Sequence, residues 1–134
     1  MKDFPIQIVT PDGIEFDGQI QSLLVKTTDG DVEILASHTD LLAAVDVGRV
    51  RLILSDGTEA YASACGGFLS VQGGIARLVN TTFEFARDID TSRAERAKES
   101  AEQKIRAARS DDELKLAKAK LMRALCRLEI ANKR

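Results

Sequence analysis

The residues able to carry chemistry are few and scattered in this 134-residue sequence. There is one histidine, His38, near Asp40, and the two cysteines, Cys65 and Cys126, lie far apart. Nucleophilic catalysis needs a base held beside its nucleophile, and metal sites need ligands at short, regular spacings. Neither pattern is present. The sequence therefore predicts no catalytic residue, no metal site and two buried, reduced thiols.

Two glycine pairs, Gly66-Gly67 and Gly73-Gly74, are the segments closest to a phosphate-binding loop. Such a loop needs further glycines, or a lysine at a fixed spacing before a helix, and these are missing. The pairs are therefore interpreted as turns and as points of close strand packing.

The junction around residue 90 carries a charge that needs a partner. Asp90 or Thr91 can cap a helix there, which places Arg93 in its first turn. Cations are unfavourable at the N-terminal end of a helix dipole. The partner of Arg93 could be Asp90, a neighbouring carboxylate or a bound phosphate.

Glycine and proline divide the chain into two parts that must position these residues. All nine glycines and both prolines fall within residues 5–74. Before that limit, Asp-Gly turn signals separate short alternating segments, such as the one in which Phe4, Ile6 and Ile8 share a face. The apolar segment 41–45 is too short for its period to be decided. We predict an α+β protein whose residues 1–86 form an all-β flattened sandwich or barrel of about ten strands.

Residues 87–134 predict an antiparallel hairpin of two helices. Apolar residues recur at spacings of three and four, and on the first helix they are Ala94, Ala97, Ala101, Ile105 and Ala108. The corresponding stripe on the second helix is Leu114, Ala117, Leu121, Leu125 and Leu128. Ser110 and Glu113 form a capping-box pattern between the helices. Because alanine buries little apolar area, we expect a weak seam and a detachable hairpin.

The charge is distributed unevenly between the two parts. Residues 1–87 hold six Lys and Arg against twelve Asp and Glu, whereas residues 88–134 hold thirteen against nine. The basic helical part contains no aromatic residue, so it lacks the stacking groups typical of nucleic-acid binding. A solvated charged face and an acidic protein partner both remain open. No apolar run is long enough to span a bilayer and no signal peptide is recognised, which predicts a cytosolic chain.

Several short motifs, read in order, match a known family. They are Ile8–Gly13, Phe16-x-Gly18, Gly30–His38 followed by Leu41-Leu42, Gly48-x-Val50-Arg51, Gly66–Val71, and Ile89-Asp90-x-x-Arg93-Ala94. In this order, and with the two-helix tail, the sequence resembles the bacterial-type epsilon subunit of F-type ATP synthase, called delta in mitochondria.

The resemblance implies a non-catalytic subunit of the rotating central stalk. Its sandwich would bind the gamma subunit and the c-ring, coupling the flow of protons or sodium ions to ATP synthesis. Its hairpin would reach the beta and alpha subunits of the catalytic head and inhibit ATP hydrolysis. The family implies no required cofactor, ATP as a regulatory ligand in some members, and no nucleic acid. It also implies a peripheral location on the cytoplasmic face of the bacterial inner membrane, without insertion.

The resemblance also assigns site residues, position by position. The implied ATP contacts are Glu84, Ile89, Asp90, Arg93, Ala94, Arg123 and Arg127. The implied c-ring contacts are Asp29, Asp31 and His38. This chain departs from the family at Ser100, where ATP-binding members often have arginine. It departs again at Glu33 and at Ala36-Ser37, where the family usually has glycine and Pro-Gly.

Two other functions are kept beside this one. The hairpin could act chiefly as an ATP sensor, for which Arg123 would be required. Alternatively, the chain could be a β-sandwich adaptor with a coiled-coil interaction arm, which would show no affinity for a gamma subunit.

Overall fold

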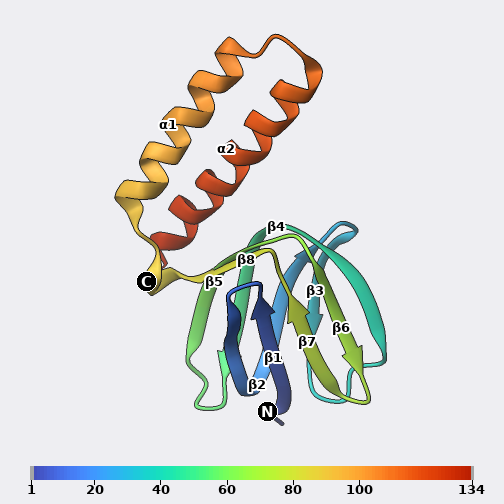
Figure 1. Ribbon diagram of the computed structural model, residues 1–134. Helices are drawn as coiled ribbons and strands as arrows, with labels where there is room; N and C mark the ends of the chain where they lie inside the picture. The colour runs from blue at the N-terminus through green and yellow to red at the C-terminus, as the bar shows by residue number, and fades with distance from the viewer. Residues whose placement is uncertain (1, 134) are drawn as a thin grey trace. The chain divides into compact units, whose positions relative to one another are not determined.

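The computed structural model describes residues 2–133, which form two compact units, residues 2–85 and 86–133. Among the described residues, the first unit holds eight strands (Figure 1). They are β1 (Phe4–Thr10), β2 (Gly13–Thr27), β3 (Gly30–Ile34), β4 (Leu41–Leu54), β5 (Glu59–Cys65), β6 (Phe68–Gln72), β7 (Ile75–Val79) and β8 (Thr82–Phe85). The second unit holds the short 3₁₀ helix η1 (Ala86–Asp88), α1 (Thr91–Ala107) and α2 (Asp111–Ala131).

The strands form a flattened barrel because two of them, β2 and β4, are long enough to serve both layers. The hydrogen-bonded order is β3-β2-β1-β7-β6-β4-β5-β8, with a further pairing of β2 with β4 that closes the ring. The first half of β2 pairs with β1 and the second half with β3 and β4. The first half of β4 pairs with β6 and the second half with β5. Counted once in each layer, β2 and β4 turn the eight strands into the expected ten.

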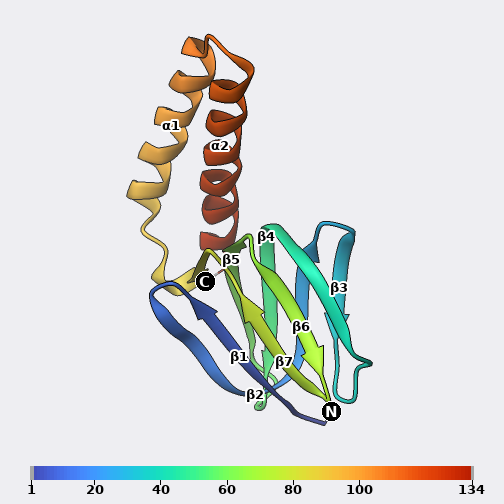
Figure 2. The ribbon, with the colours of Figure 1, turned by 45° about the vertical axis from the view of Figure 1, so that its right-hand side comes forward.

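One pairing in the barrel is parallel. β1 and β7 run in the same direction, with Ile6 opposite Ala76 and Ile8 opposite Leu78, whereas the other strand pairs are antiparallel. Figure 2 shows β1, β7 and β6 side by side in one layer. The undecided segment 41–45 is the first half of β4, where Leu42 lies opposite Ser70 and Ala44 opposite Phe68.

The core lies between the two layers and follows the predicted alternation. Phe4, Ile6 and Ile8 are each at most 3% exposed, as their shared face predicts. From other strands, Leu23, Leu52 and Leu78 are fully buried beside them. Branched and aromatic side chains on one face of each strand thus supply the apolar area that holds the barrel together.

The hairpin pairs α1 with α2 in antiparallel fashion, as predicted (Figures 1 and 2). Its seam is built on alanines spaced by seven, with Ala94 and Ala101 on α1, and Ala117 and Ala124 on α2, all at most 3% exposed. One predicted seam residue is wrong: Leu125 is 42% exposed, and Ala124 takes its place. The spacing of Leu121 and Ala124 continues the three-then-four pattern of the seam, whereas Leu125 falls on the next face.

The capping box is half confirmed. The Ser110 hydroxyl accepts a hydrogen bond from the Glu113 backbone N–H at 3.2 Å, as predicted. The Glu113 carboxylate, however, accepts from the backbone N–H of Arg109 at 2.9 Å rather than from Ser110. The box therefore reaches one residue further back and also secures the connection between the helices.

Candidate functional site

Among residues 2–133, no group of three or more His, Cys, Asp and Glu side chains could hold a metal ion. The His38 Nδ1–H donates to the backbone carbonyl of Thr39 at 2.6 Å. Cys65 and Cys126 are thiols, as predicted, but they are half-buried rather than fully buried. In the part of the chain that the structure describes, no helix has the length and hydropathy needed to cross a membrane.

The motif Ile89-Asp90-x-x-Arg93-Ala94 forms the start of α1. Asp90 is the N-cap, and its Oδ1 accepts from the Arg93 backbone N–H at 3.1 Å. Ile89 and Ala94 are each 3% exposed and occupy the positions flanking the cap at which an apolar pair commonly packs. Three of the four named motif residues, Ile89, Asp90 and Ala94, therefore stabilise the start of the helix. The exposed Arg93 side chain is the member left for a ligand.

The hairpin brings the three candidate arginines to the same end of the helix pair. Arg93 lies in the first turn of α1, and Arg123 and Arg127 lie one turn apart in the second half of α2. Because the helices are antiparallel, the start of α1 runs beside the second half of α2 (Figure 1). Arg123 and Arg127 are half-buried. Glu84 belongs to the other unit, on β8, where it lies opposite Ser63.

The three candidate c-ring residues fall into two groups. Asp29 and Asp31 lie at the turn from β2 to β3, where the Thr27 hydroxyl accepts from the Asp29 N–H at 3.2 Å. His38 lies in the connection from β3 to β4, beyond the other end of β3. Since a strand of this length spans roughly 16 Å, one small contact cannot include all three residues.

The loop that carries His38 contains a residue other than glycine with a positive φ, a backbone conformation that glycine usually adopts. Ser37 has a φ of 64°, in the left-handed region that non-glycine residues rarely enter. The backbone N–H of His38 donates to the Leu35 carbonyl at 3.2 Å and closes the turn. The Ala36-Ser37 pair thus adopts a tight turn at a cost in backbone strain.

One outer face of the sandwich carries an apolar surface that the sequence patterns did not reveal. Along β4, β6 and β7, the strand register places Leu42, Ala44, Phe68 and Ile75 on the same side. We call these four residues the apolar face; Leu42 is 74% exposed and Ile75 58%. The polar residues Ser70, Gln72 and Arg77 share that side with them. The available signal was the double leucine at 41–42, which places an apolar side chain on each side of one strand. Exposed apolar patches of this kind commonly mark protein interfaces.

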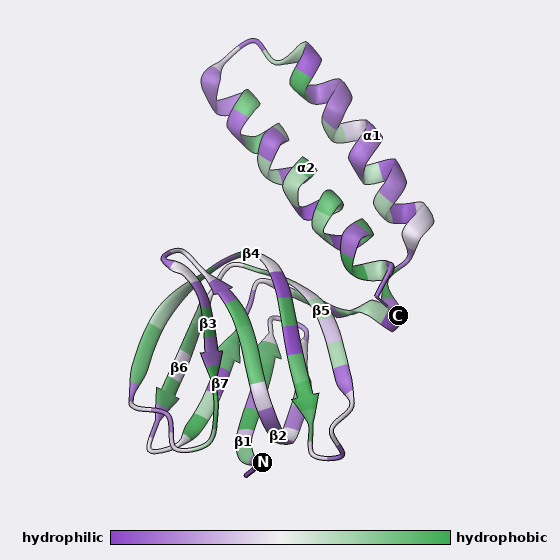
Figure 3. Cartoon of the chain, turned by 180° about the vertical axis from the view of Figure 1, so that it is seen from behind, coloured by the Kyte–Doolittle hydropathy of each residue, from purple (hydrophilic) through white to green (hydrophobic). Residues whose placement is uncertain are grey.

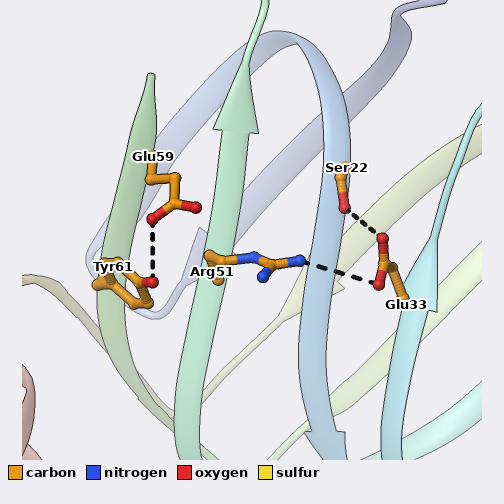
Figure 4. Close-up of polar contacts among 5 residues, drawn as sticks. All are labelled: Ser22, Glu33, Arg51, Glu59 and Tyr61. Atoms are coloured by element: carbon orange, nitrogen blue, oxygen red, sulfur yellow. Dashed lines mark hydrogen bonds and ion pairs between the residues drawn. The ribbon is translucent and has the colours of Figure 1, made fainter. Parts of the chain in front are cut away.

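The opposite layer has a polar outer surface (Figure 4). Glu33 on β3 accepts from the Ser22 hydroxyl at 3.2 Å and pairs with the Arg51 guanidinium at 3.8 Å. On β5, the Tyr61 hydroxyl donates to Glu59 at 3.1 Å. Because Ser22 is fully buried, its hydrogen bond holds the Glu33 carboxylate close to the sheet. The two outer faces therefore differ in chemistry.

Comparison with known proteins gives one family over the whole chain. The family described as "ATP synthase, Delta/Epsilon chain, beta-sandwich domain" matches residues 3–86, and "ATP synthase, Delta/Epsilon chain, long alpha-helix domain" matches residues 87–132. An ATP synthase epsilon chain from Latilactobacillus sakei is 37% identical, covering 98% of this chain and 94% of that protein. Another from Bacillus cytotoxicus is 36% identical and covers 98% of both.

Solved structures show the same fold in two mitochondrial assemblies. A chain of the Euglena gracilis mitochondrial ATP synthase, in a structure of OSCP, F1 and the c-ring, matches with a TM-score of 0.83 at 17% identity. The match covers 97% of this chain and 81% of that one. A chain from the central stalk and c-ring of the Tetrahymena thermophila enzyme matches with a TM-score of 0.67 at 14% identity, covering 97% of both.

Proposed function

This chain belongs to the ATP synthase delta/epsilon family, and from that premise we propose that it is a non-catalytic central-stalk subunit of an F-type ATP synthase. In this role it couples ion flow through the c-ring to ATP synthesis, and its hairpin inhibits ATP hydrolysis. The observation that carries the proposal is that both family domains match, in order and over nearly the full length of the curated relatives. Within this assembly the chain lies peripherally on the cytoplasmic face of a bacterial inner membrane.

The apolar face is the proposed contact with the gamma subunit. Leu42 and Ile75 expose more than half of their surface to water, and covering them with a partner would stabilise a complex. The turn at Asp29 and Asp31 and the loop at His38 are the proposed contacts with the c-ring, and they bind as two separate patches.

Binding of gamma to single-site variants tests the apolar face. We expect Leu42→Glu to weaken binding at least tenfold, because it places a charge in an apolar contact. The control is Leu35→Glu, which changes a 42% exposed leucine of the β3–β4 connection, outside the apolar face. Equal loss of affinity in both variants would assign binding to another surface.

The hairpin is the proposed inhibitory arm, directed at the beta and alpha subunits. Its seam of alanines contributes little burial, so parting the helices costs less than opening a leucine-rich seam would. The excess of Lys and Arg after residue 87 suits an acidic partner surface.

Hydrolysis of ATP by a catalytic head lacking this subunit tests inhibition. We expect the full chain to slow turnover and a chain ending at residue 86 to bind without slowing it. Gamma binding by the shortened chain is the check that it has folded. If both forms bind and neither slows turnover, the inhibitory part of the proposal fails while the central-stalk part remains.

ATP is the proposed regulatory ligand of the hairpin, with Arg123 and Arg127 holding phosphates and Arg93 joining them. The favouring observation is the placement of all three arginines at one end of two antiparallel helices. Arginine suits this task because its planar donors bind phosphate oxygens in pairs. Calorimetry should show that Arg123→Ala weakens ATP binding at least tenfold and that Arg106→Ala, in the last turn of α1, does not. Equal ATP affinity in both variants would remove the arginines from the site.

A further inference from the structure

A groove lies between the second half of α1 and the first half of α2. It has a volume of about 290 Å³. The residues that line it are Lys104, Ala107, Glu113, Leu116, Ala117 and Lys120. One lysine comes from each helix, so any ligand held by both would bridge the hairpin.

The side chains of Lys104 and Lys120 both line this groove, and both residues are exposed. A hydrogen bond with the Lys104 amino group, together with its positive charge, lowers the pKa of Lys120, and the charge of Arg123 acts in the same direction. Two ammonium groups at short range repel one another, and the repulsion weakens the pairing of the helices. A negative charge placed between them would reverse that effect.

Neither lysine has an acidic residue one turn away on its own helix. The residues one turn from Lys104 are Ser100, Ala101, Ala107 and Ala108. Those one turn from Lys120 are Leu116, Ala117, Arg123 and Ala124. None is acidic, so the usual ion pairs of a helix surface cannot form. The groove also contains the carboxylate of Glu113, which accepts from the Arg109 N–H as part of the cap and remains an anion there.

We propose that this groove binds a phosphate dianion, held between the ammonium groups of Lys104 and Lys120. Charge-assisted hydrogen bonds from ammonium groups to phosphate oxygens are among the stronger polar contacts. The small walls formed by Ala107 and Ala117 leave room for the anion between the helices. Binding would cancel the repulsion and clamp the hairpin in its paired form, because a ligand stabilises the state that binds it. Arg123, one of the ATP contacts proposed above, lies one turn from Lys120 but does not line the groove, so the phosphate site does not require it.

The test is a titration of the full chain at constant ionic strength, in which NMR signals of the lysine side chains report binding. The probes are inorganic phosphate and methyl phosphate, which distinguish a free anion from a phosphate monoester. We expect saturable shifts at Lys104 and Lys120, and a loss of affinity of at least tenfold in Lys104→Gln and in Lys120→Gln. Lys118→Gln is the matched control, since it removes the same charge from an exposed position on α2 outside the groove.

Three results would overturn the inference. One is a shift that rises without saturation for both probes. Another is an equal loss of affinity in the Lys118→Gln control. The third is phosphate binding that survives Lys104→Gln and Lys120→Gln but disappears in Arg123→Gln, which would assign the anion to the arginines. That last outcome would leave the proposed ATP site standing, so the two proposals fail separately.

Discussion

The sandwich and the hairpin use opposite kinds of core. In the sandwich, the fully buried side chains are large and branched, including Ile8, Leu23 and Leu52. Along the hairpin seam, the buried side chains are mainly alanines, and the large buried side chains Ile89 and Ile130 lie just before α1 and near the end of α2. Figure 3 shows that α1 is hydrophilic along most of its length. Burying one leucine or isoleucine contributes about 1.5–3 kcal/mol, far more than an alanine can. The sandwich therefore contributes most of the folding free energy, and the hairpin is the part whose two helices can separate.

The largest expected effect is at the close contact between Gly67 and the β7 end. A Cβ at Gly67 would clash with the backbone carbonyl oxygen of Val79, and the Gly67 φ of 82° is unfavourable for other residues. We expect Gly67→Ala to lower the free energy of unfolding by about 4 kcal/mol or more, measured with urea. Gly57→Ala is the control, because its φ is 86° but nothing lies within 4 Å of its Cβ. That variant should cost about 1–2 kcal/mol; equal costs would mean that the clash is relieved by local movement.

The next effect compares a leucine in each region directly. Leu52→Ala removes a fully buried side chain from the sandwich and should cost about 2–5 kcal/mol. Leu121→Ala removes a half-buried side chain from the hairpin and should cost about 1 kcal/mol. Hydrogen exchange would show whether each loss is confined to its own unit. A larger cost for Leu121→Ala would reverse the comparison between the two cores.

A smaller effect is expected at the cap between the helices. Ser110→Ala removes the acceptor for the Glu113 N–H and should destabilise α2 by about 1 kcal/mol. Helicity followed by circular dichroism measures the loss, and Ser110→Asn should restore most of it. If Ser110→Ala leaves helicity unchanged, the contact of Glu113 with the Arg109 N–H is sufficient for the cap.

The smallest effect concerns pH and lies in the sandwich. Hydrogen bonds from the Thr58 side chain and backbone N–H lower the pKa of Asp56 below its usual value. A lowered pKa means that the carboxylate stabilises the fold above the usual pKa, and that this contribution is lost as the pH falls through the lowered value. Asp56→Asn should therefore reduce stability slightly at pH 7, and the difference should shrink below about pH 4. An unchanged difference at low pH would show that charge is not involved.

The candidate site was only partly predictable from the sequence. Ser110 was predictable as a cap, and Asp90 as one of two candidates with Thr91, because capping depends on residues three positions apart. The apolar face was not recognised, because the exposure of Leu42 depends on its pairing with β6. The approach of Lys104 to Lys120 also depends on two helices distant in sequence, so no local pattern could reveal it.

By itself, the sequence determined the boundary between strands and helices, the faces of the strands, the capping residues and the family. These follow from local chemistry, in which glycine and proline break helices and apolar periods of 2 and 3.6 separate strands from helices. The tertiary structure decided that β2 and β4 pass through both layers, that Ala124 rather than Leu125 faces α1, and that Glu33 is tied to Arg51. Each of those outcomes depends on which distant segment packs alongside, and long-range packing is not encoded in local spacing.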